Sequence, residues 1–283
     1  MALINLKEML KAADKEVYGV GAFNTLNLEM SKAIIDAAEE ERSPVIIQIA
    51  ELLFQFMPDW EVLSAATLML AHKAKVPVVV HLDHGMNYEN IVKAMRLGFS
   101  GVMIDGSHLS FDENVRQTKE VVKTAHALGI PVEAELGTVP GEEGLYNTQN
   151  TVMTDAMLVK EFIGLTEADV LAVCIGNVHG NYIKTPCLDF NRLREIKRIA
   201  GVPLVLHGGS GLTDEDFGSC IRLGINKVNI FTDLCNSALS KLDAIYEEKR
   251  EGVSYPKILS VTSEAVKQEA IKKMRLFGSS GKG

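Results

Sequence analysis

Short runs of β-forming apolar residues recur along the chain, and segments with a helical spacing of apolar residues separate them. The runs are VGAFN (20–24), VIIQIA (45–50), VVVHLD (78–83), GVMIDG (101–106), VEAELG (132–137), VLAVCIG (170–176), PLVLHGG (203–209) and KVNIFT (227–232). Intervening stretches such as NYENIVKAMRLG and ENVRQTKEVVKTAHALG place apolar residues three and four positions apart, and both end at glycine, as many helices do. Nearly continuous apolar strands that alternate with helices predict a parallel sheet with the helices outside.

The eight runs match the strand number of a (β/α)8 barrel, so the predicted fold class is α/β, as a single-domain TIM barrel over residues 1–283. A doubly wound open sheet is the competing architecture. No Pro-, Gly- or Ser-rich linker divides the chain, which favours one domain. The longest polar connection, TVPGEEGLYNTQNTVMTD at 138–155, follows the fifth strand, and its length is typical of a lid or a disordered segment.

Composition and charge indicate which kinds of binding partner to expect. The net charge is −8, and the 29 Lys and Arg residues form no dense patch, which argues against a nucleic-acid or membrane-surface partner. The amphipathic N-terminus lacks the apolar stretch of a signal peptide, and no apolar window approaches the length of a membrane span. The four cysteines form no C-x-x-C pair, which fits a reducing compartment. We therefore expect a cytoplasmic protein that binds a small molecule.

Polar residues gather where the predicted strands end, which is the edge that carries the active site in this type of barrel. Asn24, Asp83, His84, Asp105, Glu133, Glu135, His179, His207, Asn229 and Thr232 all lie at or near the carboxyl end of a predicted strand. Seven strands thus direct polar groups to one mouth.

Three of these residues are histidines on separate strands. His84, His179 and His207 can converge on one ion and leave a fourth position open, as a catalytic zinc requires. Asp105 and Glu135 can hold a ligand histidine, bind a second metal position, or form buried ion pairs. His81 shares a strand face with Asp83, one layer deeper, and is expected to be a buried structural imidazole.

Glycines and hydroxyls follow the seventh strand in the motif HGGSGL, just before a predicted helix. Free backbone N–H groups at such a place favour a phosphate, and the polar NIFTD after the eighth strand strengthens that interpretation. A plain tight turn is the alternative. Lys272, Lys273 and Arg275, near the C-terminus, could assist a phosphate, but a solvated helix face is the favoured expectation.

The predicted mouth has no lysine at a strand end, since Lys227 begins its strand and Lys184 lies in a loop. A Schiff-base mechanism therefore lacks an obvious nucleophile. A divalent ion can instead polarise a carbonyl and stabilise an enediolate, while Asp83 transfers protons. These groups together indicate carbon–carbon or proton chemistry next to a ketone.

The motifs LDHG, VEAELG, HGNY, LDFNRLREI, VPLVLHGGSGL, KVNI and LFGSSGK resemble those of class II fructose-bisphosphate or tagatose-bisphosphate aldolases, and the resemblance spans essentially the whole chain. It implies a TIM barrel, a homodimer or homotetramer, and a zinc-dependent reversible aldol reaction. The partners in that reaction would be dihydroxyacetone phosphate and an aldehyde, commonly glyceraldehyde 3-phosphate.

The resemblance also assigns roles to residues. It makes His84, His179 and His207 the zinc ligands, and Asp83 the acid/base that deprotonates the C4 hydroxyl in cleavage. Asp105 and Glu135 match alternative metal positions or supports of the ligands. Glu143, with Glu142 as its alternative, matches the carboxylate that moves the C1 proton of dihydroxyacetone phosphate. The positions that match the phosphate site, where the family often also binds a monovalent cation, are Gly180, Gly208, Gly209, Ser210, Asn229 and Thr232. Asn24 is assigned to the same substrate site.

Four positions depart from the family pattern around the substrate. Ala50 stands where a serine is frequent, Phe231 where Asp or Ala is found, Asn177 where a small hydroxyl residue is common, and Gly144 where an acidic residue is usual. These departures leave the substrate less defined than the metal chemistry. The alternatives are a metal-dependent sugar-phosphate isomerase or epimerase, and an inactive aldolase-like accessory subunit.

Overall fold

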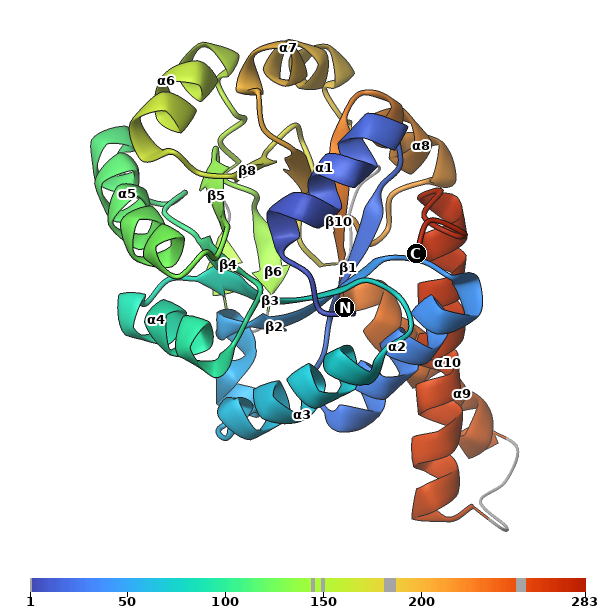
Figure 1. The fold of residues 1–283 in the computed structure, drawn as a ribbon. Coiled ribbons are helices and arrows are strands. Elements are labelled where there is room, and N and C mark those ends of the chain that lie inside the picture. Colours follow the sequence, from blue (N-terminus) through green and yellow to red (C-terminus); the bar gives the residue numbers. More distant parts are fainter. Residues whose placement is uncertain (1, 144–145, 149–150, 181–186, 248–252) are drawn as a thin grey trace.

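Eight parallel strands pair side by side and close into a barrel, in the order β1-β10-β9-β8-β5-β4-β3-β2 (Figure 1). The computed structural model describes residues 2–143, 146–148, 151–180, 187–247 and 253–283, except for the side chains of 142, 143, 146–148 and 246. The barrel strands are β1 (Val20–Asn24), β2 (Val45–Ala50), β3 (Val78–Gly85), β4 (Gly101–Ile104), β5 (Val132–Leu136), β8 (Val170–Val173), β9 (Leu204–Leu206) and β10 (Ile225–Ile230). The closed sheet confirms the predicted TIM barrel, and the doubly wound alternative is wrong.

The helices lie outside the closed sheet (Figure 1), and buried apolar residues from most of them pack with the strands in one core. They are α1 (Leu6–Glu16), α2 (Leu28–Glu41), α3 (Trp60–Lys73), α4 (Tyr88–Leu97), α5 (Phe111–Ala127), α6 (Ala156–Thr166), α7 (Phe190–Ala200), α8 (Asp214–Arg222), α9 (Thr232–Glu247) and α10 (Tyr255–Leu276), with a short 3-10 helix η1 (Glu51–Phe56) after β2. No helix among the described residues is long and apolar enough to cross a membrane.

Helix α1 covers the amino-terminal end of the barrel. Its buried residues Leu6, Met9, Leu10 and Ala13 form one cluster with inward-facing strand residues, including Val79. Because this cluster fills the lower part of the barrel interior with apolar side chains, buried polar groups concentrate higher up, toward the carboxyl ends of the strands.

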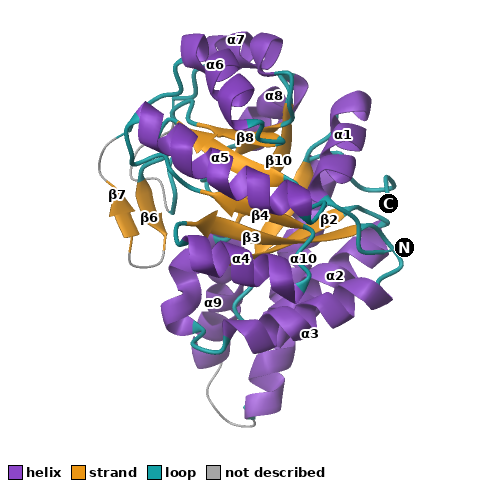
Figure 2. Ribbon diagram, turned by 60° about the vertical axis from the view of Figure 1, so that its left-hand side comes forward, coloured by secondary structure: helices purple, strands orange, loops and turns teal. Residues whose placement is uncertain are grey.

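The long connection after β5 contains a small antiparallel hairpin, β6 (Gly141–Glu143) and β7 (Tyr146–Thr148). Figure 2 shows this hairpin beyond the end of the barrel to which β3 points, and α1 at the opposite end. A bridge between Thr138 and Val152 closes the base of the connection, and a second one joins Gly141 to His179. The segment expected to act as a lid thus begins beside a candidate metal ligand.

Candidate active site

Two adjacent residues at the end of β3, Asp83 and His84, both enter the barrel mouth. Successive residues of a regular strand point to opposite faces. Here the register with β4 shifts between Leu82 and Gly85, and His84 has a φ of 46°, in the left-handed region that non-glycine residues rarely adopt. Both side chains are buried. An unusual backbone at this point lets one strand supply a carboxylate and an imidazole to the same site.

The carboxylate of Asp83 is held by two amides. Asn24 Nδ2 donates to Asp83 Oδ2 at 2.8 Å, and Asn229 Nδ2 donates to Oδ1 at 3.0 Å. Gln48 Nε2 in turn donates to Asn24 Oδ1 at 2.7 Å. Burial alone would raise the pKa of Asp83, but the neighbouring histidines, Lys227 and Asn24 outweigh it and lower the pKa. Asp83 is therefore an ionised, oriented proton acceptor.

The three predicted metal ligands converge. One ring nitrogen from each of His84, His179 and His207 lies within 4.8 Å of the others, and all three residues are buried. His207 Nδ1 is 2.9 Å from His84 Nε2. Burial lowers the pKa of both His179 and His207, which favours the neutral imidazole that binds metal. Three converging imidazole nitrogens fit a zinc ion with an open fourth position.

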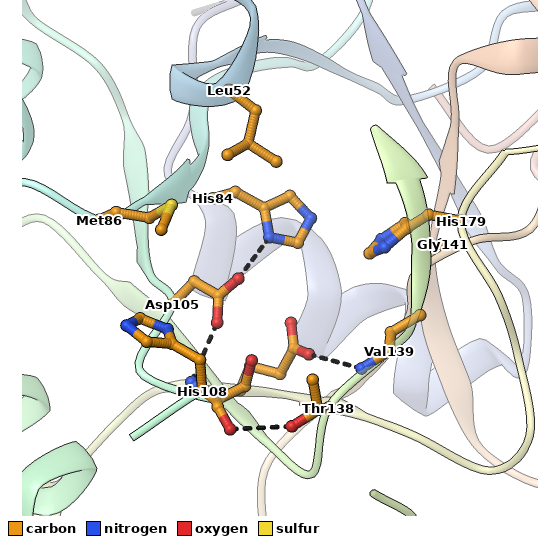
Figure 3. A pocket seen from close by; sticks show the side chains of 11 residues that line it. Leu52, His84, Met86, Asp105, His108, Thr138, Val139, Gly141 and His179 are labelled. Atoms are coloured by element: carbon orange, nitrogen blue, oxygen red, sulfur yellow. Dashed lines mark hydrogen bonds and ion pairs between the residues drawn. The ribbon is translucent and has the colours of Figure 1, made fainter. Parts of the chain in front are cut away.

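Asp105 and Glu135 approach the same ion site from the side of His84. Asp105 Oδ2 is 2.8 Å from His84 Nδ1, so this carboxylate orients the ring (Figure 3). Burial alone would raise the pKa of Asp105, yet its hydrogen bond to His84 and the charge of that ring lower it. Burial and nearby Asp105 raise the pKa of Glu135 well above its usual value. His84, Asp105 and Glu135 form a second group with metal-ligand spacing.

A cavity of about 220 Å³ opens above these residues. Figure 3 shows His84, His179 and Asp105 directed into it, with Leu52 and Met86 on one side. The residues that line it are Leu52, His84, Met86, Asp105, Ser107, His108, Glu135, Thr138, Val139, Gly141 and His179. Imidazole and carboxylate groups therefore share one cavity with the apolar side chains of Leu52, Met86 and Val139.

The glycine-rich segment after β9 passes very close to the segment that carries His179. Gly208 has a φ of 60°, and a Cβ atom at this position would lie 2.2 Å from the carbonyl oxygen of Val178. Only glycine allows the two segments to approach in this way. Ser210 is buried, and its Oγ accepts a hydrogen bond from the backbone N–H of Asp233 at 3.3 Å.

The predicted phosphate-site residues lie around these segments. Gly180 follows His179 with a φ of 78°, Gly209 is next to Gly208, and Thr232 begins α9. Asn229 points its amide at Asp83.

The prediction for Lys273 is wrong, because its side chain is buried and forms an ion pair with Asp233 at 2.5 Å. This ion pair joins α10, which carries Lys273, to the start of α9.

Sequence reasoning missed two contributors to the site. Gln48 lies on β2 and orients Asn24, and Lys227 lies inside the barrel, fully buried against Glu133. The alternation of inward and outward positions along β2 and β10 could have placed both side chains inside. It could not have identified their partners. His81 is fully buried, as expected.

A family model described as fructose-bisphosphate aldolase class-II matches residues 4–282. The chain belongs to the class II fructose-bisphosphate aldolase family. The resemblance seen in its motifs is therefore confirmed, and this class II aldolase is a zinc-dependent lyase of carbohydrate metabolism that acts by aldol cleavage.

Individual relatives match over nearly their full lengths. A protein of Bacillus subtilis named probable fructose-bisphosphate aldolase is 42% identical, with 99% of each chain covered. A 6-phospho-5-dehydro-2-deoxy-D-gluconate aldolase of Bacillus licheniformis is 41% identical and covers 100% of this chain and 97% of its own. The crystal structure of the YdjI aldolase from Escherichia coli K12 has a TM-score of 0.88 and 38% identity, with 99% of each chain covered. All three relatives are named aldolases, and the names of the two Bacillus proteins give different substrates.

Proposed function

We propose that this class II aldolase reversibly cleaves a ketose 1-phosphate or ketose 1,6-bisphosphate to dihydroxyacetone phosphate and an aldehyde. The observation that carries the proposal is that three buried imidazoles converge beside the amide-held carboxylate of Asp83 at the mouth of the barrel. The family places the reaction in aldol chemistry.

The chemistry of cleavage divides between the metal ligands and Asp83. A zinc ion held by His84, His179 and His207 would polarise the C2 ketone and stabilise charge on its oxygen. Asp83 accepts the proton of the C4 hydroxyl while the C3–C4 bond breaks. The electron pair of that bond moves toward C2, and C4 leaves as the aldehyde carbonyl. Asn24 and Asn229 keep the Asp83 carboxylate in place during the transfer.

Glu143 is proposed to return a proton to the carbon that becomes C1 of dihydroxyacetone phosphate, with Glu142 as the alternative. Its side chain lies outside the part of the chain whose side chains the structure describes. Its backbone belongs to β6, which begins at the cavity residue Gly141. Glu143→Ala is expected to slow exchange of the C1 proton with solvent and to leave zinc content unchanged. An unaltered exchange rate in Glu143→Ala, with a slow one in Glu142→Ala, would move the role to Glu142.

The ketose phosphate is proposed to bind across the segments after His179, β9 and β10. Free backbone N–H groups and hydroxyls at the start of a helix suit a phosphate, and the proposed residues are Asn24, Gly180, Gly208, Gly209, Ser210, Asn229 and Thr232. A monovalent cation at the same place would offset the phosphate charge. A second metal position at Asp105 and Glu135 is supported by their spacing with His84.

The remaining expectations follow from the family. We propose a homodimer or homotetramer, a cytoplasmic location, and sugar phosphate as the only ligand class, without nucleic acid or membrane. Sedimentation equilibrium of the purified protein tests the oligomer, and a purely monomeric mass would reject it.

We propose that the preferred substrate is not fructose 1,6-bisphosphate, because residues around the proposed substrate site depart from the family pattern. Ala50 ends β2 directly beside Asp83 and supplies no hydroxyl. Phe231 follows β10, half-buried against the core. Both positions lie at the mouth of the barrel, where the rest of the sugar must fit.

A triose-phosphate assay tests the function. The zinc-loaded protein is offered fructose 1,6-bisphosphate, tagatose 1,6-bisphosphate and related ketose 1-phosphates, and the release of dihydroxyacetone phosphate is measured. We expect release from at least one of these ketoses, with fructose 1,6-bisphosphate not the best. Conversion of a ketose phosphate without any triose phosphate would instead support an isomerase or epimerase.

A further inference from the structure

A layer of charged and polar side chains lies directly below the metal ligands. Glu133 precedes Glu135 by two residues on β5, Lys227 precedes Asn229 by two on β10, and His81 has the same spacing on β3. Because strand side chains alternate, each points into the barrel one layer deeper than its neighbour in the site. Glu133, Lys227 and His81 are all fully buried.

Glu133 connects this layer to the metal site through His207. Its Oε1 is 2.8 Å from His207 Nε2, and the opposite ring atom, Nδ1, is 2.9 Å from His84 Nε2. Asn229 Nδ2 lies 3.3 Å from the same Nδ1. The imidazole of His207 therefore has a carboxylate on its inner side and the candidate ion position on its outer side.

Lys227 holds Glu133 from below. Its Nζ is 2.8 Å from Glu133 Oε2 and 3.1 Å from Oε1. His81 Nε2 lies 3.6 Å from Oε2, and neither ring nitrogen of His81 has a hydrogen-bond partner among the described residues. Lys227 Nζ is thus within ion-pair distance of both oxygens of this fully buried carboxylate, which favours its charged form. Glu133 is therefore an ionised acceptor in the middle of the barrel.

We propose that Glu133, held in place and charged by Lys227, is a positioning residue that fixes the tautomer of His207 for metal binding. A neutral imidazole carries hydrogen on one nitrogen and a lone pair on the other. An ionised carboxylate can only accept, so it keeps the hydrogen on Nε2. The lone pair of Nδ1 then faces His84 and the ion.

This arrangement also gives Lys227 a role other than that of a nucleophile. Both short contacts of its Nζ go to Glu133, which lies between Lys227 and His207. An amine engaged in this way beneath the site is not placed to attack a substrate ketone. Its charge instead stabilises the buried carboxylate that orients the ligand.

The inference rests on the proposed three-histidine zinc site and is tested by zinc affinity. Glu133→Gln alone would leave the charge of Lys227 buried without a partner, so the double variant Glu133→Gln/Lys227→Met is measured beside it. The probe is zinc itself, titrated into metal-free protein in competition with a chromophoric chelator. We expect both variants to bind zinc about 10- to 100-fold more weakly than the unmodified protein.

A control at the other end of the barrel separates positioning from general destabilisation. Asp169 is a buried carboxylate that also accepts from a lysine, Lys7 (2.6 Å), and from a histidine Nε2, that of His126 (2.8 Å). Asp169→Asn is expected to lower the unfolding temperature and to leave zinc affinity unchanged.

The tautomer of His207 can be measured directly, and it would not change if Glu133 only stabilised the fold. In metal-free protein with ¹⁵N-labelled histidine, the ring signals of His207 should show hydrogen on Nε2. In the double variant they should show a mixture of tautomers. His207→Gln identifies the signals by their loss.

The outcomes separate this inference from the proposed function. If the unmodified protein binds no zinc, the proposed function fails and this inference fails with it. If it binds zinc and both Glu133 variants bind within about two-fold of it, the inference is overturned while the function stands. Equal weakening in Asp169→Asn, or hydrogen on His207 Nδ1 in the unmodified protein, also overturns it.

Discussion

Asp83 shows how individual residues set the chemistry of the site. Two side-chain amides donate to its carboxylate, and a third, from Gln48, orients one of them. The amides of Asn24 and Asn229 each donate a hydrogen bond to one oxygen of the buried carboxylate. These bonds hold the carboxylate in one orientation and favour its ionised form. In the proposed mechanism, the proton that leaves the sugar hydroxyl therefore has a fixed acceptor beside the three histidines.

Replacement of this acceptor by its amide tests its role. Asp83→Asn keeps the shape of the side chain but removes its ability to take a proton, so kcat should fall by about 10²- to 10⁴-fold. Zinc content, measured by atomic absorption, should remain as in the unmodified protein because the three imidazoles are untouched. Asp169→Asn, which lies far from the mouth, serves as the control with unchanged kcat. A kcat within a few-fold of normal in Asp83→Asn would remove Asp83 from the reaction.

For single residues, the sequence predicts which side chains point into the barrel better than it predicts which side chains contact one another. The period of two along each strand was enough to place Asp83 and His81 on one face, and the structure has both inside the barrel. The pairing of Glu133 with His207 joins residues on different strands, far apart in the chain. Such a contact depends on how the barrel closes, and the pattern of a single strand does not contain that information.

Among the elements, several strands end earlier than their apolar patterns predict, although β3 runs on to Gly85. The run 101–106 becomes β4, which stops at Ile104 because Asp105 turns its side chain to accept the backbone N–H of Ser107 at 3.0 Å. The run 170–176 becomes β8, which stops at Val173, and Gly176 has a φ of 104°. The site residues therefore lie in the last few positions of a strand or beyond its end. An apolar pattern therefore predicts that a strand is present more reliably than it predicts the residue at which the strand ends.

The attachment of α1 to the base of the barrel is the clearest case of one residue joining several elements. Asp169, just before β8, contacts Lys7 in α1 and His126 in α5, and it accepts the backbone N–H of Val132 at 2.9 Å. Burial alone would raise the pKa of Asp169, but the bonds to Lys7 and His126 outweigh it and lower the pKa below its ordinary 3.8.

This lowered pKa predicts a pH-dependent stability. Because the folded pKa lies below the unfolded one, Asp169 stabilises the protein fully above about pH 4 and loses that contribution as pH falls through the folded pKa. Asp169→Asn should reduce the free energy of unfolding by about 1–3 kcal/mol at neutral pH, and the reduction should shrink in acid. Urea unfolding of both proteins from about pH 7 to about pH 3 measures it. A difference that stays constant over this range would contradict the assignment.

For the whole molecule, the fold and the metal chemistry were predictable, and the substrate was not. The count of apolar runs predicts a barrel, and closure brings strand ends from around the barrel to one mouth. The relatives with similar chains are named for different substrates, which fits a metal site that is kept while the surrounding residues vary. We propose that substrate choice depends on side chains such as Phe231 and on the loops around the mouth, and the apolar pattern of the sequence does not predict the shape of those loops.

Metal removal tests the central claim, that aldol cleavage in this barrel depends on a metal held by His84, His179 and His207. The protein is treated with an excess chelator, dialysed and assayed for triose phosphate from its best ketose phosphate, before and after zinc is added back. A parallel sample receives borohydride with substrate. The account predicts that cleavage disappears with the metal, returns with zinc, and leaves no covalent adduct. Cleavage that survives complete metal removal, with an amine adduct trapped on a lysine such as Lys227, would contradict it.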